Sequence, residues 1–362
     1  MNTDRHVFVI AEAGVNHNGS LVMAMQLIDA AADAGADAVK FQTFRAESLV
    51  GANAPKADYQ LRNTDAGESQ LAMLGRLELS EEDHAALILH ARARSIAFLS
   101  TPFDVDSLRM LVGRFALDTI KVPSGEVTNA PFLLEIARVA GRVILSTGMS
   151  TLAEVHTALA VLAFGFATPA GAQPTKETIS HAFASAAGQS ALRTRVTLLH
   201  CTTEYPAPCG DVNLRAMDTL GSAFGLSVGY SDHTAGMHVA IAAVARGAVM
   251  IEKHCTLNRE LPGPDHKASL EPNEFAQMVR QIRDIEQALG DGVKQPAPVE
   301  LNNRNIARRS LVAGRDISAG ELFSAQNLTC KRPGDGVPPV EYWRMLGQAA
   351  PRAYAKDEKI DA

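Results

Sequence analysis

Eight short apolar segments, each ending in polar side chains, constrain the fold of this chain more than any other feature. They cover residues 6–14, 37–44, 96–103, 119–126, 143–150, 196–203, 226–233 and 249–256. Their hydrophobic residues are mostly continuous rather than alternating, which is typical of strands covered on both faces of a sheet. Helical segments separate them. Eight strand–helix repeats in about 290 residues predict an α/β fold, a (β/α)8 barrel.

Residues that begin and end helices lie between these predicted strands. Ser20 has the chemistry of an N-cap and Gly35 that of a helix stop, so a helix is predicted between them. Thr151 and Glu154 have the spacing of a capping box. A doubly wound open sheet is the main alternative. No Gly-x-Gly-x-x-Gly motif follows any of the apolar segments, and this favours the barrel.

The character of the sequence changes after residue 290. Residues 291–305 are poor in hydrophobic side chains and contain two prolines, which is typical of a linker. Residues 306–362 contain short β-like pieces between turns rich in Gly and Pro, and so few residues bury little core alone. We therefore expect a catalytic barrel at residues 1–290, a linker at 291–305 and a small domain at 306–362. Residues 166–195, rich in Ala and Ser, are predicted to form a partly helical surface excursion.

Composition and charge argue against several classes of protein. Of the 362 residues, 46% are hydrophobic and 20% are charged, which is ordinary for a soluble globular enzyme. The formal net charge of -6 gives no electrostatic reason to expect a nucleic-acid partner. No run of eighteen apolar residues predicts a membrane span, and the first residues lack the apolar core of a signal peptide. The four cysteines form no CxxC pair and predict reduced thiols in a cytoplasm.

Every predicted strand brings polar groups to the carboxyl-end rim, where barrel enzymes place their active sites. One group consists of two lysines and three serines: Lys40, Lys121, Ser124, Ser146 and Ser231. Lysines supply charge and hydroxyls supply directed hydrogen bonds, so this group could hold a phosphate and a carboxylate. The simpler alternative for the lysines is salt bridging across the barrel mouth. Glu252 and Lys253 could serve that purpose alone.

Two histidines, His233 and His254, follow neighbouring predicted strands and could share one divalent cation. Two protein ligands leave positions open for substrate and water, which suits a Lewis acid better than a structural zinc. Glu12, Glu126 and Asp265 are candidates for proton transfer or for holding sugar hydroxyls. For any single histidine, the simpler alternative is an ordinary loop residue whose hydrogen bonds are satisfied.

Motifs from the first strand to the last domain carry a resemblance to a known family. They include IAEAGVNHNGS, AGADAVKFQTF, KVPSGE, LHCTTEYPAP, GYSDHT, EKHCTL, GPDHKASLEP and KRPGDG. In these motifs the chain resembles the sialic acid synthases, that is, bacterial N-acetylneuraminate synthase and relatives that make other nonulosonates. The resemblance implies a TIM barrel followed by a small antifreeze-like (SAF-type) domain. It also implies condensation of phosphoenolpyruvate with an open-chain sugar of the N-acetylmannosamine type, with release of phosphate.

The same resemblance implies roles for individual residues. The residues expected to be catalytic are Glu12, Glu126, Tyr205 and Asp265. Those expected to bind the substrates are Lys40, Gln42, Lys121, Ser124, Ser146, Thr203, Ser231 and Arg332. His233 and His254 are expected to bind Mn²⁺, with Mg²⁺ or Co²⁺ as alternatives. Arg332, in the last motif, is expected to reach the barrel of a partner subunit in a domain-swapped homodimer.

Alternatives to this function differ in what they require of the residues. A legionaminate synthase would use 2,4-diacetamido-2,4,6-trideoxymannose in place of N-acetylmannosamine. A metal-dependent aldolase or sugar isomerase would use the two histidines without needing the pair of lysines. A non-catalytic carbohydrate-binding protein would not explain the polar groups at the barrel rim.

Overall fold

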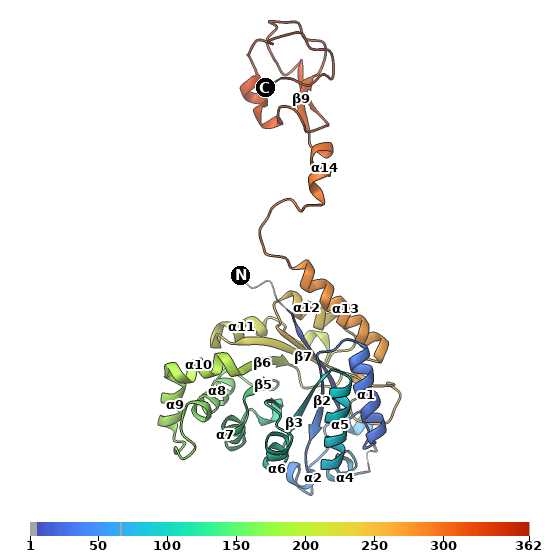
Figure 1. The fold of residues 1–362 in the computed structure, drawn as a ribbon, viewed down its shortest axis with the longest axis vertical. Coiled ribbons are helices and arrows are strands. Elements are labelled where there is room, and N and C mark those ends of the chain that lie inside the picture. Colours follow the sequence, from blue (N-terminus) through green and yellow to red (C-terminus); the bar gives the residue numbers. More distant parts are fainter. Residues whose placement is uncertain (1–5, 66, 362) are drawn as a thin grey trace. The chain divides into compact units, whose positions relative to one another are not determined.

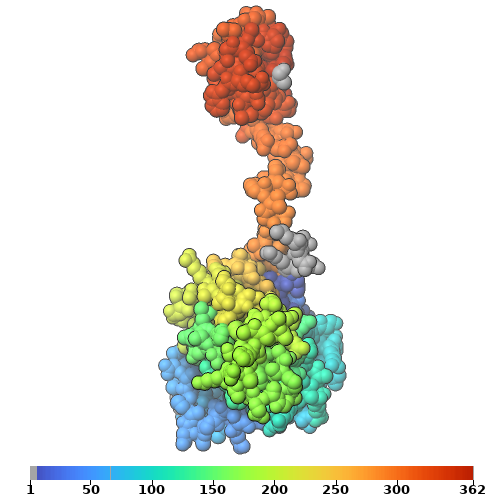
Figure 2. All heavy atoms as spheres, turned by 90° about the vertical axis from the view of Figure 1, so that its left-hand side faces the viewer, coloured from blue at the N-terminus to red at the C-terminus, as the bar shows by residue number. Residues whose placement is uncertain are grey.

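The structure is a computed structural model of the chain, and it describes residues 6–65 and 67–361. The chain divides into two compact units, Met1–Gly290 and Asp291–Ala362. The second unit contains the orange-to-red end of the colour scale in Figures 1 and 2. Each unit has a hydrophobic core of its own, so the two are described separately.

Eight parallel strands form the centre of the first unit. They are β1 (Phe8–Gly14), β2 (Ala38–Thr43), β3 (Ala97–Pro102), β4 (Thr119–Val122), β5 (Arg142–Ser146), β6 (Val196–Cys201), β7 (Ser227–Asp232) and β8 (Met250–His254). Their hydrogen-bonded order is β3-β2-β1-β8-β7-β6-β5-β4. The two end strands, β3 and β4, contact each other. The sheet therefore curls into a near-barrel whose closing edge lacks a hydrogen-bonded ladder among the described residues. The predicted barrel fold is confirmed.

Helices follow the strands and surround them in Figure 1. The main ones are α1 (Leu21–Asp33), α5 (Glu81–Ala93), α6 (Val105–Arg109), α7 (Ala130–Val139), α8 (Leu152–Ala167), α11 (Ala216–Phe224), α12 (His238–Ala245) and α13 (Pro272–Ala288). Ser20 accepts a hydrogen bond from the backbone of α1, and Thr151 and Glu154 form the predicted capping box of α8. The excursion at residues 166–195 contains α9 (Lys176–Ala184) and α10 (Ala186–Arg195), which pack against α8.

Side-chain alternation along the strands decides what faces the barrel interior. Outward residues such as Val9, Val39 and Ile251 pack against the helices in the main core. Inward residues form a separate apolar cluster: Ile10, Ala38, Leu99, Ile144 and Leu199. Two positions further along the same strands, the inward residues are Glu12, Lys40, Thr101, Ser146 and Cys201. The interior is therefore apolar toward the amino ends of the strands and polar at their carboxyl ends.

The connection between β2 and α5 adds three short helices to the barrel. They are α2 (Ala46–Leu49), α3 (Asp58–Asn63) and α4 (Gln70–Gly75). Their apolar side chains meet residues of the β1 and β3 loops in a small cluster built around Val15, Phe44 and Leu77. This cluster is separate from the main core of the barrel. It gives the β2 side of the barrel mouth an apolar lining.

The second unit is small and mainly irregular. Its elements are α14 (Glu300–Ala307), β9 (Ser310–Ala313), β10 (Leu328–Lys331), η5 (Pro339–Glu341) and α15 (Tyr342–Met345). β9 and β10 pair antiparallel, and Leu311, Phe323 and Tyr354 belong to its core. Helix α14 begins within the segment predicted to be a linker. In either unit, no helix among the described residues has the length and hydropathy needed to cross a bilayer.

A buried ion pair joins β7 to β8 on the outer side of the sheet. Lys253 Nζ lies 2.9 Å from Asp232 Oδ2, and both side chains are 0% exposed. Lys253 also donates to the backbone carbonyl of Thr234, 2.5 Å away. Burial lowers the pKa of Lys253, while Asp232 opposes the shift. Because alternation turns Lys253 away from the barrel interior, its charge serves the fold and not the cavity.

Replacing Lys253 by Met should lower the free energy of unfolding of the first unit by about 3–5 kcal/mol, because Asp232 is left buried and unpaired. Arg246→Met is the matched control, since it removes an exposed ion pair with Asp218 and should cost less than about 1 kcal/mol. Denaturant unfolding followed by far-UV circular dichroism measures the free energy of unfolding of both variants. Tryptophan fluorescence does not serve here, because the single tryptophan, Trp343, reports on the second unit. Equal effects of the two variants would contradict the structural role of Lys253.

Candidate active site

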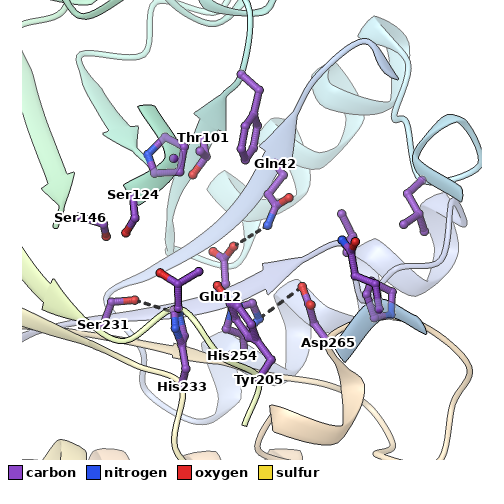
Figure 3. A pocket seen from close by; sticks show the side chains of 18 of the residues that line it. Glu12, Gln42, Thr101, Ser124, Ser146, Tyr205, Ser231, His233, His254 and Asp265 are labelled. Atoms are coloured by element: carbon purple, nitrogen blue, oxygen red, sulfur yellow. Dashed lines mark hydrogen bonds and ion pairs between the residues drawn. The ribbon is translucent and has the colours of Figure 1, made fainter. Parts of the chain in front are cut away.

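A cavity of about 280 Å³ lies at the carboxyl ends of the strands. Each of the eight strands, or the turn directly after it, contributes to its lining. The predicted site residues that line it are Glu12, Lys40, Gln42, Lys121, Ser124, Ser146, Thr203, Tyr205, Ser231, His233, His254 and Asp265. Figure 3 shows most of these side chains converging from different strands. The arrangement follows from the parallel sheet, which brings all carboxyl ends to one rim.

Two predicted site residues, Glu126 and Arg332, are not among the residues that line this cavity. Glu126 lies in the 3₁₀ turn η2 (Ser124–Glu126), and its carboxylate accepts a hydrogen bond of 2.7 Å from Asn129 Nδ2. It therefore holds the turn that leads into α7 and does not join the other predicted acids. Arg332 follows β10 in the second unit, where its side chain is exposed.

Four charged side chains form a buried cluster in the cavity. Lys40 Nζ lies 2.5 Å from Glu12 Oε2 and 3.7 Å from Glu252 Oε2. Lys121 Nζ lies 3.2 Å from Glu252 Oε1. All four residues are at most 4% exposed, and Lys40 also donates to Thr101 Oγ1 at 2.9 Å. The salt bridging considered for the lysines is thus present, and both lysines also face the cavity.

The environment of this cluster shifts the pKa values of its two carboxyl groups in opposite directions. Burial raises the pKa of Glu12, although the charge of Lys40 opposes it. Burial acts in the same direction on Glu252, but the charges of Lys121 and Lys40 outweigh it and hold the pKa of Glu252 below its usual range. Glu252 is therefore a constant counter-ion for the lysines, and Glu12 is the carboxyl group of the cluster that can take up a proton.

Hydroxyl groups gather at the side of the cavity formed by β4, β5 and β6. Ser124 Oγ accepts a hydrogen bond of 2.9 Å from Gly148 N. A Cβ atom at Gly148 would lie 2.5 Å from Thr203 Oγ1, so this close approach requires glycine. Ser146 Oγ and Thr203 Oγ1 are buried and have no hydrogen-bond partner among the described residues. Buried polar groups are rarely left unpaired, so these hydroxyls indicate a polar ligand.

The two histidines lie side by side, with ring centroids 5.5 Å apart. His233 Nδ1 donates to the carbonyl of Thr202 at 2.7 Å, which leaves a lone pair on Nε2. His254 Nδ1 lies 3.9 Å from Asp265 Oδ2. Burial lowers the pKa of His233 to about 4 and that of His254 well below its usual range. Both rings are therefore neutral near pH 7.

Neutral imidazoles are suited to bind a divalent metal ion, and the carbonyl of Thr202 fixes the orientation of the His233 ring. Among the described residues there is no group of three or more His, Cys, Asp and Glu placed to hold a metal. An ion here would therefore have His233 and His254 as its protein ligands, with further positions open to substrate and water. The donor set fits a labile Lewis-acid ion and not a structural zinc.

Aromatic rings extend the cavity away from the histidines. The ring of Tyr205 lies 4.3 Å from His233 and 4.8 Å from Tyr59 of α3, measured between centroids. In Figure 3, Asp265 lies on the side of His254 that is opposite to Ser124. Burial raises the pKa of Asp265 to about 7. The cavity thus has a hydroxyl end near β5 and an end with aromatic rings and a protonatable acid.

The α2–α4 connection supplies lining residues that the sequence analysis did not single out. They are Leu49, Val50, Tyr59, Gln60, Gln70, Met73, Leu74 and Leu77. None of them follows a predicted strand, so the strand-end pattern could not reveal them. The sequence did contain one signal for part of this lining. Gln70, Met73 and Leu74 have helical spacing, and residues three and four apart share one face of a helix.

Comparison of the sequence with known proteins shows which family this chain resembles. The model of the NeuB family matches residues 27–294, and that of the SAF domain matches residues 308–362, where the antifreeze-like domain was predicted. N,N'-diacetyllegionaminic acid synthase of Campylobacter jejuni is 49% identical over 98% of this chain and 99% of its own length. The enzyme of the same name from Legionella pneumophila is 44% identical over 94% of this chain and 89% of its length.

A solved structure agrees with both the fold and the sequence similarity. The crystal structure of N-acetylneuraminic acid (sialic acid) synthetase from Leptospira borgpetersenii has a TM-score of 0.66 and 32% sequence identity to this chain. The match covers 83% of this chain and 90% of the chain in the Leptospira structure. The family match covers most of the barrel and, except for Glu12 and Val15, the residues that line its cavity. The chain belongs to the NeuB family.

Proposed function

We propose that the protein condenses phosphoenolpyruvate with open-chain 2,4-diacetamido-2,4,6-trideoxymannose, giving N,N'-diacetyllegionaminate and phosphate. The two relatives of highest identity reported above are both named for this product. The sialic acid synthetase structure is less similar in sequence. This comparison favours the alternative sugar over N-acetylmannosamine, which was the first expectation from the sequence.

The observation that carries the choice of sugar is the apolar wall of the cavity. Val15, Leu49, Met73, Leu74 and Leu77 all contribute to this wall. The proposed sugar has three methyl groups, one at C6 and one on each acetyl group, whereas N-acetylmannosamine has one methyl group and more hydroxyls. Each buried methyl or methylene group contributes about 0.8 kcal/mol. The wall therefore supports the sugar with more methyl groups.

The hydroxyl end of the cavity supports the placement of phosphoenolpyruvate. This substrate carries a phosphate and a carboxylate, and both require donors that are charged or strongly polar. Lys40 and Lys121 supply the charges, and the buried hydroxyls of Ser146 and Thr203 find no hydrogen-bond partner among the residues that the structure describes. Ser231 donates to Glu252 Oε1 at 2.9 Å and so stands next to the same lysines.

The reaction forms a bond between C3 of phosphoenolpyruvate and C1 of the sugar. The aldehyde oxygen takes up a proton and becomes a hydroxyl, and a water molecule adds to C2 and loses a proton. The bond between C2 and the bridging oxygen then breaks, so that phosphate leaves with the proton of the C2 hydroxyl as the ketone forms. A divalent ion on His233 and His254 would supply Lewis-acid polarisation of the aldehyde.

Two carboxyl groups have properties that suit these proton transfers. Asp265, whose pKa is raised by burial to about 7, stands near His254 and can donate to the aldehyde oxygen. Glu12, beside Lys40, can accept the proton from the attacking water. Exchange with solvent restores both groups after each turnover. Tyr205 packs against both histidine rings and helps to shield this region from bulk water.

Predictions about the second unit stand apart from this chemistry. We propose, from the family resemblance, that Arg332 closes over the barrel of a partner subunit in a domain-swapped homodimer. Its guanidinium would donate to the acetamido carbonyl of the sugar and help to exclude water. A cytoplasmic location stays a prediction from the sequence.

The test of the proposed function compares two sugars in an assay of phosphate release from phosphoenolpyruvate. We expect kcat/KM for 2,4-diacetamido-2,4,6-trideoxymannose to exceed that for N-acetylmannosamine by about tenfold or more, since two additional methyl groups are buried. Equal values, or a preference for N-acetylmannosamine, would reject the proposed sugar. Absence of phosphate release with either sugar would instead favour an aldolase or an isomerase.

Removal of the metal is the second test. EDTA should abolish turnover, and Mn²⁺, Mg²⁺ or Co²⁺ should restore it. In titration calorimetry without substrates, His233→Ala and His254→Ala should weaken Mn²⁺ binding by roughly tenfold or more. His156→Ala, which removes an exposed histidine of α8, is the control and should bind Mn²⁺ as the unaltered protein does. Unchanged Mn²⁺ binding in both site variants would show that the ion is held elsewhere.

A further inference from the structure

One face of helix α4 presents an amide next to an apolar surface inside the cavity. Gln70, Met73 and Leu74 are spaced by three and four residues, so they share this face. All three line the cavity. Leu74 also packs in the small apolar cluster that contains Val15 and Leu77. The anion binding and proton transfers proposed above use none of these three side chains.

A neighbouring amide fixes the orientation of Gln70. Gln60 Oε1 accepts hydrogen bonds from the backbone N–H of Ala57 at 3.0 Å and from Gln70 Nε2 at 3.2 Å. A backbone N–H can only donate, so the atom of Gln60 that it contacts must be the oxygen. Gln70 must therefore turn its NH₂ group toward Gln60. None of the hydrogen bonds among the described residues uses the remaining oxygen, Gln70 Oε1.

A secondary acetamide has the groups that match this surface. It carries one N–H donor, which Gln70 Oε1 can accept, and one methyl group, which can pack on Met73 and Leu74. A hydroxyl in its place lacks the acetyl methyl group, so it leaves the apolar face uncovered and can hydrogen-bond to water instead of to Gln70. A site built to hydrogen-bond a substrate N–H discriminates against analogues that lack this group.

The position of α4 relative to the reacting centre agrees with a substituent distant from C1. The ring of Tyr205 contacts His233 on one side and Tyr59 on the other, with centroid distances of 4.3 Å and 4.8 Å. Tyr59 directly precedes Gln60 in α3, and Gln60 is bonded to Gln70 of α4. The contacts that lead from His233 to Gln70 thus run through Tyr205 and Tyr59, as expected for a substituent distant from C1.

We propose that Gln70, Met73 and Leu74, with Gln60 as the residue that orients Gln70, form a subsite for the C4 acetamido group of the sugar. This inference rests on the proposed function, because N-acetylmannosamine has a hydroxyl at C4. The acetamide N–H donates to Gln70 Oε1, and the acetyl methyl packs on Met73 and Leu74. The α2–α4 connection is then the part of the barrel that selects among nonulosonate precursors.

The experiment uses two sugars that differ only at C4, namely 2,4-diacetamido-2,4,6-trideoxymannose and 2-acetamido-2,6-dideoxymannose. Gln70→Ala should lower kcat/KM for the diacetamido sugar roughly tenfold, mainly through KM, because the acetamide N–H loses its acceptor. For the C4-hydroxyl sugar the change should stay within about twofold. Leu74→Ala should show the same selectivity with a smaller loss of about fourfold.

Two further variants keep the test decisive. Gln26→Ala, in an exposed position of α1, is the matched control and should change neither sugar. Gln70→Met keeps the length and helix propensity of the side chain, so it should reproduce the selective loss if Gln70→Ala proves unstable in thermal unfolding.

The outcomes separate the subsite from the proposed function. If the unaltered protein does not prefer the diacetamido sugar, the proposed function fails and the subsite fails with it. If it does prefer that sugar, but Gln70→Ala and Gln70→Met lower kcat/KM for both sugars equally or for neither, the function stands and the subsite is overturned.

Discussion

The pairing of two buried lysines with two buried glutamates inside the barrel is the interaction on which the site depends. Burying a charge costs several kcal/mol, and the cost is tolerable only when an opposite charge lies close by. Glu252 contacts both lysines, and Glu12 contacts Lys40. Burial raises the pKa of Glu12, so this carboxylate can take up a proton beside Lys40, while Glu252 keeps its charge and holds both lysines.

Side chains alternate between the two faces of a strand, so neighbouring charged residues of β8 have different roles. Glu252 points into the barrel and holds the lysines, whereas Lys253 points outward and joins β8 to Asp232 of β7. The apolar cluster around Ile10 and Leu199 fills the interior beneath the charges. The charged layer is thus confined to the carboxyl-end half of the barrel, where the cavity lies.

The sequence was sufficient to predict the fold and the place of the cavity, because both depend on local patterns. Parallel strands end at one rim, so polar residues that follow apolar runs predict the cavity without knowledge of packing. Glu126 also follows a predicted strand, but it is not among the residues that line the cavity, because a 3₁₀ turn directs its carboxylate to Asn129. Gln60 and Gln70 were missed because their helices are positioned by distant contacts, such as that of Asn63 Nδ2 with the carbonyl of Pro264 at 2.9 Å.

The Michaelis constant for phosphoenolpyruvate in Lys121→Met tests the central claim most directly, namely that the buried lysines bind this substrate. The account predicts a rise of roughly tenfold or more, since a charge-assisted contact is lost, with little change in the constant for the sugar. Lys176→Met, at an exposed position of α9, should leave both constants unchanged. A Lys121→Met variant that folds normally, but whose sugar constant rises while that for phosphoenolpyruvate stays the same, would contradict the account.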